Sequence, residues 1–408
     1  MLWASAHAVA SRVPALVVLG HRESLWAHAD HLHRHPSRHS SANNHRVAEL
    51  AALALARAAL PDAPWSFTRL PEVLAHQLHD DGWPKEQSIP YLAHILEWGL
   101  IAHRTGRVDL AEDLARGLRP LLAVLADDGQ PMVMGDNGGD EVLPSHGQPH
   151  ALSVAGAVAV ALGARPPAAW RPDLRSAMLG LGCQPSVGPA VRRGSSFDSG
   201  GLSILRNARW AVALDHGPVG MKPLAAHGHA DHLAMWAHLD GSPLFGGRGT
   251  STYHVPLTRQ RERSTAGSSA LILDGRSTAT PHEHPFLWVD QPRATLEHLR
   301  LAEDGGEIVG RLTCDHAVHR RHVHLHRGRL VVRDHLEGRG LRQVLLQWHL
   351  APGVSAERTG WVGPAELNHQ VTETPHASAY GRTEPAGTLH SVGAVRLPTV
   401  LQTVFHPS

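Results

Sequence analysis

Three kinds of residue are scarce in this chain of 408 residues, and each shortage limits what the protein can be. Cysteine occurs only at Cys183 and Cys314, so no disulfide framework is predicted and the redox compartment stays open. Lysine occurs only at Lys85 and Lys222, so arginine carries nearly all of the positive charge. Tyrosine occurs three times, which makes each tyrosine a residue of interest.

An excess of charge of either sign is also missing. The formal net charge is +1, which argues against nucleic acid as the main partner. No apolar run is long enough to span a membrane. The first residues include a short apolar piece without a basic region before it, so no signal peptide is predicted. A chain of this length can bury two cores, and two domains are therefore expected.

The first part of the chain has the composition and loop lengths of packed helices. Asn43 or Asn44 can cap an Ala- and Leu-rich segment over residues 46–60. Successive helices with modest loops are typical of helical hairpins, so we expect a helical domain over residues 1–165 and a linker over 166–199. The further predicted helices are Leu70–His79, Gln87–Arg104, Asp109–Ala126 and Ala151–Leu162.

From about Gly200 the hydrophobic pattern changes to a period of two. Short alternating runs separated by Gly, Asp and Pro are typical of an antiparallel sandwich, which we predict over residues 200–408. The fold class is therefore α+β with several domains. The predicted strands include Leu202–Arg206, Trp210–Asp215, a pair after residue 232, Ala270–Asp274, Ile308–Thr313, Val323–Leu325, Leu330–Arg333, Val344–His349 and Val400–Phe405.

The densest group of polar side chains lies between two of these strands. His227, His229, Asp231 and His232 fall within six residues, directly before a predicted hairpin that turns at Asp240. Three imidazoles and a carboxylate at the start of a strand suit proton transfer or metal binding. Because the chain has 34 histidines, this group alone is weak evidence for either role.

Two further polar groups lie upstream. Residues 41–45 end in Asn43, Asn44 and His45, and residues 80–91 run from two aspartates through Glu86 to Tyr91. Taken alone, the first group is typical of a helix cap and the second of a loop that starts a helix.

Together, the order and spacing of these groups resemble the heparinase II/III-like polysaccharide lyases, including their alginate and oligoalginate lyase relatives. The resemblance covers most of the chain. It implies an (α/α) toroid, shorter here than in the family, followed by a β-sandwich. The matching motifs are Asn43-Asn44-His45, Asp81-Gly82, Glu86-Gln87-Ser88 with Tyr91, Gly135-Asp136-Asn137, His227-Gly228-His229-Ala230-Asp231 with the strand pair up to Tyr253, and Arg263-Ser264-Thr265.

The resemblance also implies β-elimination on a uronic-acid polysaccharide. The proton to be removed lies beside a carboxylate, so that carboxylate must be neutralised while negative charge develops. Asn44 and His227 are the expected donors to it. Tyr91 is the expected base or acid, with His45 as its partner, and Tyr253 is a second candidate tyrosine.

The same resemblance gives the expected partner, an anionic polysaccharide, and a periplasmic or secreted location. The residues expected to bind that polysaccharide are Asn43, Glu86, Asp136 and Arg263.

Many members of the family hold a structural zinc ion, and His229 is the ligand that this chain retains. The other two ligand positions contain Gly246-Gly247 and Gly267-Ser268-Ser269. Because two of three ligands are missing, a zinc site of the usual geometry is not expected.

Two other functions stay open. A carbohydrate-binding or cell-envelope assembly protein with weak catalysis is favoured by the missing zinc ligands. A glycoside hydrolase needs paired carboxylates, for which Glu86, Asp136 and Asp231 are available. The Asn, His and Tyr set fits elimination better.

Overall fold

The computed structural model describes residues 21–138, 141–145, 147–182, 194–314 and 317–407. The chain forms two compact units, a helical one within residues 1–84, 91–122 and 139–188, and a strand-rich one within residues 85–90, 123–138 and 189–408. Segments 85–90 and 123–138 therefore belong to the strand-rich unit, although helices flank them in the sequence. The domain limits expected from the sequence stay predictions.

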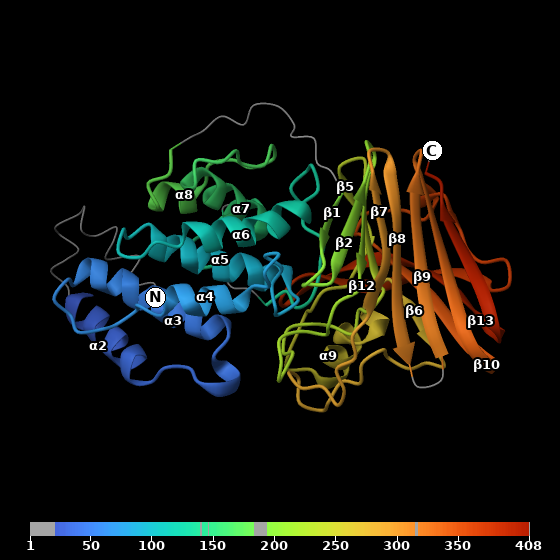
Figure 1. Ribbon diagram of the computed structural model, residues 1–408, viewed down its shortest axis with the longest axis horizontal. Helices are drawn as coiled ribbons and strands as arrows, with labels where there is room; N and C mark the ends of the chain where they lie inside the picture. Colours follow the sequence, from blue (N-terminus) through green and yellow to red (C-terminus); the bar gives the residue numbers. More distant parts are fainter. Residues whose placement is uncertain (1–20, 139–140, 146, 183–193, 315–316, 408) are drawn as a thin grey trace. The chain divides into compact units, whose positions relative to one another are not determined.

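The helices of Figure 1 lie mostly in the first half of the chain. Five of them overlap the predicted ranges, whereas α2 and α8 were not predicted. Asn43 caps α3 because its side chain accepts a hydrogen bond from the backbone N–H of His45. The helices are α2 (His21–Arg34), α3 (Asn44–Ala59), α4 (Leu70–Gln77), α5 (Ile89–His103), α6 (Ala111–Ala123), α7 (His150–Ala161) and α8 (Leu174–Met178), with the 3-10 helix η2 (His39–Ser41).

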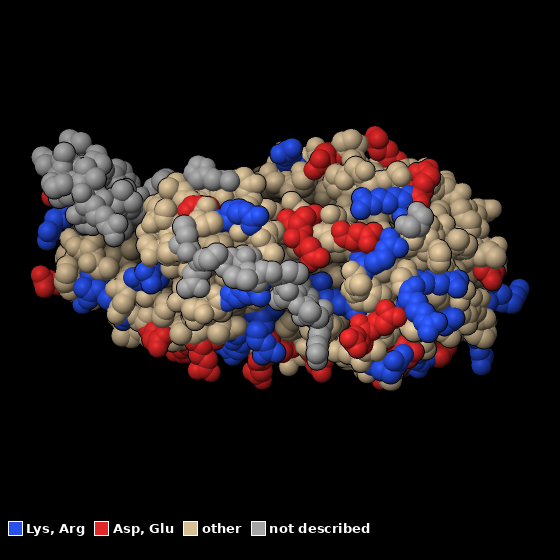
Figure 2. Space-filling model, turned by 90° about the horizontal axis from the view of Figure 1, so that it is seen from above, with Lys and Arg blue, Asp and Glu red and all other residues tan. Residues whose placement is uncertain are grey.

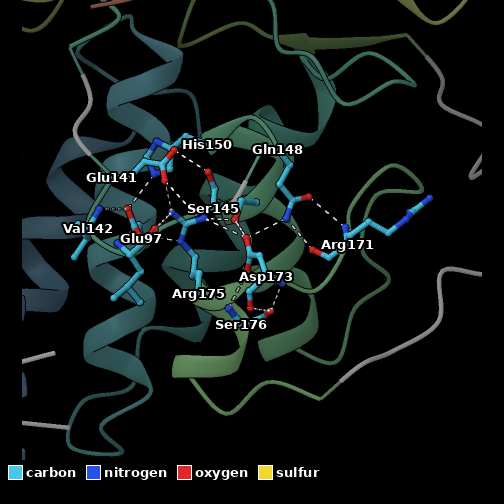
Figure 3. A network of polar contacts seen from close by, with 12 residues as sticks. Glu97, Glu141, Val142, Ser145, Gln148, His150, Arg171, Asp173, Arg175 and Ser176 are labelled. Carbon is cyan, nitrogen blue, oxygen red and sulfur yellow. Dashed lines mark hydrogen bonds and ion pairs between the residues drawn. The ribbon is translucent and has the colours of Figure 1, made fainter. Parts of the chain in front are cut away.

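A buried network of polar side chains joins α5, α7 and α8 in the helical unit (Figure 3). Glu97 is completely buried and accepts hydrogen bonds from Arg175 Nε and His150 Nε2, each at 2.9 Å. The backbone N–H groups of Val142 and Leu143 donate to the same carboxylate. Burial alone would raise the pKa of Glu97, but His150 and Arg175 outweigh it and lower the pKa to about 2. The carboxylate therefore stays charged and holds three helices and a loop together.

The strand-rich unit contains one antiparallel sheet in which the described strands are hydrogen-bonded in the order β1-β2-β3-β4-β5-β10-β9-β8-β7. Strands β6 and β13 also pair with β10, and β11 and β12 pair with β13. The strands are β1 (Ser195–Phe197), β2 (Leu202–Arg206), β3 (Trp210–Asp215), β4 (Met235–Leu239), β5 (Ser242–Gly246), β6 (Leu271–Leu273), β7 (Thr295–Ala302), β8 (Gly305–Cys314), β9 (Ala317–His326), β10 (Arg329–Leu350), β11 (Trp361–Val362), β12 (Asn368–Ala379) and β13 (Arg382–Phe405).

The prediction of an antiparallel sandwich is wrong, because the described strands form one continuous sheet that includes two long strands, β10 and β13. The predicted strands Leu330–Arg333 and Val344–His349 are both parts of β10, which pairs with β13 along its length. The register shifts between Leu336 and Gly340, and Gly340 has a φ of +88° that favours glycine. The strand is thus irregular at this point without ending. The toroid in the helical unit stays a prediction.

The largest apolar core among the described residues lies between the strands, and a smaller one contains Val219, Ala225, Ala230, Ala279 and Trp288. The aromatic centre of the larger core consists of Phe245, Trp348 and Phe405, whose ring centroids lie 5.0 to 5.1 Å apart. This unit also contains α9 (Pro256–Arg263) and the 3-10 helices η3 (Thr265–Gly267) and η4 (Glu357–Thr359).

The surface carries charge of both signs. On the face in Figure 2, basic and acidic side chains are interspersed, as the small net charge suggests. Among the described helices, none has the length and apolarity needed to cross a membrane. Cys314 is exposed, and Cys183 lies outside the described residues.

Candidate active site

Asp136 is the centre of a buried polar network in the strand-rich unit. Its Oδ1 accepts hydrogen bonds from His229 Nε2 at 2.9 Å and from Thr250 Oγ1 at 2.8 Å. Its Oδ2 accepts from His227 Nδ1 at 3.1 Å and from Arg259 Nη2 at 3.0 Å. Arg259 Nη1 also donates to Oδ1. One carboxylate therefore orients two imidazoles, a hydroxyl and a guanidinium.

A tight turn places Asp136 in this position. Gly135 has a φ of +67°, and a Cβ there would lie 2.5 Å from the carbonyl oxygen of Gln87 and 2.8 Å from that of His227. The backbone N–H of Asp136 donates to the same His227 oxygen, and Ser88 Oγ donates to the Asp136 carbonyl. The turn therefore requires glycine at position 135, and hydrogen bonds hold Asp136 at both its backbone N–H and its carbonyl oxygen.

The network keeps Asp136 ionised. Burial would raise the pKa of its carboxyl, but Arg259, His227 and His229 outweigh burial and hold the pKa well below its usual range. An ionised carboxylate can only accept hydrogen bonds, so His227 donates through Nδ1. This bond fixes the orientation of the His227 ring.

Three partly exposed aromatic rings lie beside this network. Tyr253 is 5.0 Å from Phe286 and 5.0 Å from Tyr380, measured between ring centroids. The His227 ring meets Phe286 edge-on at 5.9 Å, and the Arg259 guanidinium lies 4.9 Å from the Tyr253 centroid. We call Tyr253, Phe286 and Tyr380 the aromatic patch. Rings in such a patch can stack against the apolar face of a sugar.

Comparison with known proteins identifies the family at this point. Residues 189–392, half of the chain, match the family model for the heparinase II/III-like C-terminal domain. The chain belongs to the heparinase II/III-like family. No curated protein matches it.

Solved structures of lyases share the fold of this heparinase II/III-like chain. Heparinase III aligns with a TM-score of 0.68 at 15% identity, over 93% of this chain and 63% of that one. A heparan sulfate lyase from Pedobacter heparinus aligns with a TM-score of 0.65 at 15% identity, over 93% of this chain and 62% of that one. A chondroitin AC lyase from Streptomyces coelicolor A3, in complex with chondroitin sulphate, aligns with a TM-score of 0.52 at 12% identity, over 91% of this chain and 61% of that one. The chain thus spans about three fifths of the length of these relatives.

The candidate residues of the helical unit lie near the starts of two helices. Asn44 opens α3 and is 3% exposed, whereas the adjacent His45 is exposed. Tyr91 is in the first turn of α5, is 9% exposed, and meets His94 edge-on. Asn43 caps α3, as described above. The chemical roles of these residues stay predictions.

Three residues expected to bind substrate are buried in the strand-rich unit. Glu86 is 7% exposed, and Asp136 is completely buried within the network. Arg263 is also completely buried, and its guanidinium donates to the carbonyl oxygens of His282 and Pro285. The structure therefore favours positioning roles for Asp136 and Arg263, and direct contact of these residues with a glycan stays a prediction.

The residues present do not fit the zinc ion that the family implies. His229 Nε2, the retained candidate ligand, is hydrogen-bonded to Asp136, whose carboxylate already binds the positive guanidinium of Arg259. Within the described part of the chain, no three His, Cys, Asp or Glu side chains are grouped so that they could hold a metal ion. We therefore derive no chemical step from a metal.

The rest of the His-rich motif is buried. Burial raises the pKa of Asp231 to about 6, and burial together with Asp231 raises that of Asp215 well above its usual range. Burial lowers the pKa of His232 to about 4, and this neutral ring bonds Thr278 Oγ1 and the carbonyl oxygen of Pro292. Asp215, Asp231 and His232 are therefore buried side chains beneath the loop that contains His227 and His229.

Sequence reasoning missed four residues of the site, Thr250, Arg259, Phe286 and Tyr380. Arg259 is one of three arginines at a spacing of two in α9, and nothing in that pattern distinguishes it. Phe286 is one of five phenylalanines and lies in an irregular loop. Thr250 could have been found, because it belongs to the Gly-Thr pair that precedes Tyr253 in the family motif.

Proposed function

We propose that this chain is a polysaccharide lyase that cleaves a uronic-acid-containing glycan by β-elimination. The observation that carries the proposal is the fixed orientation of His227, which is bonded to a buried anion and lies against the aromatic patch. Membership of the heparinase II/III-like family supports the reaction class.

His227 is suited to the first requirement of elimination, neutralisation of the substrate carboxylate. With Nδ1 bonded to Asp136, the ring is held in one orientation, and we assign Nε2 as the atom that meets the substrate carboxylate. We assign Asn44 as the second donor to the same carboxylate. A charge-assisted hydrogen bond of this kind strengthens as negative charge develops in the transition state.

Proton transfer is the second requirement. We assign Tyr91 as the base or acid and His45 as its partner, with Tyr253 as the alternative tyrosine. Asp136 and Arg259 act through the residues they hold, His227 and Tyr253. The aromatic patch provides a stacking surface for a sugar ring. On family grounds we also propose that the helical unit belongs to an (α/α) toroid.

The test is the ultraviolet absorbance of an unsaturated uronate, followed over time with heparan sulfate, chondroitin sulfate, hyaluronan and alginate. Elimination leaves a double bond conjugated to the carboxylate, whereas hydrolysis does not. We expect a rise on at least one substrate. Binding without a rise on any of them would contradict the lyase and favour a carbohydrate-binding or assembly protein.

The tyrosine assignment has its own test. Tyr91→Phe removes the hydroxyl and keeps the ring, so it is expected to abolish elimination while glycan binding and the thermal unfolding temperature stay unchanged. Full activity of this variant would show the assignment to be wrong, and Tyr253→Phe would then be measured next.

A further inference from the structure

The loop over residues 281–288, which contains Phe286, is a closed hairpin. Its two ends form an isolated antiparallel bridge. Inside the bridge, the backbone N–H of His282 donates to the carbonyl oxygen of Leu287 at 3.1 Å, and the N–H of Leu287 donates to the carbonyl oxygen of His284 at 3.2 Å. The second bond closes a β-turn, so the backbone of the loop has a defined course up to its tip.

Side chains of α9 hold this loop in place. The Arg263 guanidinium donates to three backbone carbonyl oxygens of the loop, those of His282, His284 and Pro285. Arg259, which also binds the buried carboxylate of the candidate site, donates through Nε to the same Pro285 oxygen at 3.0 Å. The helix that orients the candidate active site therefore also fixes the backbone of the loop beside that site.

His284 is an exposed side chain at the tip of the loop, next to the aromatic patch. Its ring centroid lies 5.9 Å from that of Phe286. Phe286 also meets His227 at 5.9 Å and Tyr253 at 5.0 Å, again between ring centroids. Phe286 thus links the exposed imidazole of His284 to the histidine assigned to the substrate carboxylate.

The hydrogen bond of the His284 ring determines which nitrogen carries its proton. Nδ1 lies 3.3 Å from the backbone nitrogen of Phe286, and a backbone N–H can only donate. Nδ1 is therefore the acceptor, and the neutral imidazole has its proton on Nε2. The Nε2–H group of this exposed side chain takes no part in that bond and is a donor for another molecule.

A hydrogen-bond donor beside an aromatic ring suits a sugar. The apolar face of a sugar ring can stack on the aromatic ring, whereas its hydroxyl groups project sideways and need polar partners. Stacking alone does not fix how the sugar is rotated, and a directional hydrogen bond does. Glu283, the residue before His284, is an exposed acid, which favours a neutral hydroxyl over a carboxylate or sulfate group as the acceptor.

We propose that His284 is a substrate-binding residue whose Nε2–H donates to a hydroxyl of the sugar that stacks on Phe286. That the bound molecule is a glycan rests on the proposed function, whereas the donor and its position rest on the loop alone. Because the same Phe286 ring contacts His227, this bond fixes the rotation of the sugar whose carboxylate His227 meets.

His284→Asn tests the donor while keeping the turn. The side-chain oxygen of Asn accepts a hydrogen bond from the backbone N–H two residues later, as His284 Nδ1 does, but the variant has no group at the position of Nε2. We expect KM for the polysaccharide that is cleaved to rise about three- to tenfold with little change in kcat, because one hydrogen bond is lost. His284→Gln, whose amide nitrogen reaches the position of Nε2, is expected to restore part of the loss.

His282→Asn is the matched control. His282 is also exposed, and its Nδ1 accepts the backbone N–H of His284 at 3.0 Å, so the same substitution alters the same kind of hydrogen bond earlier in the loop. We expect this variant to keep the KM of the wild type. Both variants are expected to keep its thermal unfolding temperature. An equal rise of KM in both variants, or a marked fall of the unfolding temperature in His284→Asn, would assign His284 to the fold of the loop and overturn the proposal.

This proposal and the proposed function fail in different ways. Binding of heparan sulfate, chondroitin sulfate, hyaluronan and alginate is measured by titration calorimetry beside the product assay. If no polymer yields an unsaturated product but the binding of one of them weakens in His284→Asn and not in His282→Asn, the lyase falls and the role of His284 stands. If the product forms and His284→Asn leaves KM unchanged, the role of His284 falls and the lyase stands. Neither binding nor product with any polymer would overturn both.

Discussion

The networks around Glu97 and Asp136 are built from the same parts, a buried carboxylate with an arginine and a histidine, and they differ in what surrounds them. Glu97 accepts two backbone N–H groups as well, so its oxygens are used to join helices and a loop. The partners of Asp136 in the network are all side chains, and one of them, His227, lies against the partly exposed aromatic patch.

A third set of this kind supports the distinction. Asp334, Arg321 and His319 are buried on β9 and β10, and Arg321 also donates to the carbonyl oxygen of Leu233. These contacts, too, fix one part of the fold to another. The comparison teaches that a buried acid with Arg and His can be structural, and that the contact of His227 with a partly exposed aromatic ring is what singles out the Asp136 network.

The largest difference is expected between the two histidines. His227→Ala is expected to lower kcat/KM for elimination by about 10²–10⁴-fold, because a positioned acid–base or donor group contributes that much. His150→Ala, its counterpart beside Glu97, is expected to leave kcat/KM unchanged and to lower stability. Initial rates and urea unfolding of both variants check this prediction. Equal loss of activity in both would remove the distinction between the networks.

Neutralising the carboxylates is expected to destabilise both networks similarly. Glu97→Gln leaves Arg175 without its anion, and Asp136→Asn does the same to Arg259, at a cost of about 3–5 kcal/mol each. Urea unfolding measures the two losses. Only Asp136→Asn is expected to lower kcat/KM for elimination as well, since the carboxylate that orients His227 is lost; an unchanged kcat/KM would contradict the link between them.

A buried histidine whose ring bonds a hydroxyl and a backbone carbonyl sharpens the comparison. His232 has a pKa of about 4 in the fold, below its value when unfolded, so the unfolded chain binds the extra proton first. Stability from the neutral ring is complete above about pH 6.5 and is lost as the pH falls towards 4, by an amount on the order of 3 kcal/mol. Unfolding of the wild type and His232→Gln at both pH values tests this. A variant with the same pH dependence as the wild type would contradict it.

The smallest effect is expected at the edge of the aromatic patch. Tyr380→Leu removes a ring that is 41% exposed and is expected to raise KM about three- to tenfold with little change in kcat. Trp26→Leu is the control, because Trp26 is similarly exposed and pairs with Trp65 in the helical unit. An equal rise in KM for both variants would show that the patch has no special part in binding.

Local pattern was enough to predict the helices with a continuous apolar face. The Ala- and Leu-rich segment after Asn43 became α3 with the expected cap. In contrast, α2 was missed because its sequence, rich in His and Arg, has a weak apolar face. The sandwich was predicted wrongly because Gly338-Arg339-Gly340 has the composition of a turn, whereas β10 continues through it.

The candidate site was predictable only where residues form a motif. Asp136 and His227 were both singled out by motif, yet their bond joins positions 91 residues apart, and no local pattern indicates such a contact. Arg259 lies 123 residues from Asp136, in a helix whose arginines all look alike in the sequence. Tertiary packing alone determines which of these arginines reaches the carboxylate.

The strand-rich unit consists of three segments that are separated in the sequence, and this has a consequence for how the chain is synthesised and inherited. Residues 123–138, with Asp136, leave the ribosome long before the strands they belong with, so this carboxylate is made before the residues that bind it. A gene fragment beginning at residue 189, where the family match begins, would encode His227, His229 and Arg259 without their anion. Recombination that separates the two halves of the gene would therefore separate the acid from its partners, which ties the helical half and the strand-rich half into one inherited unit.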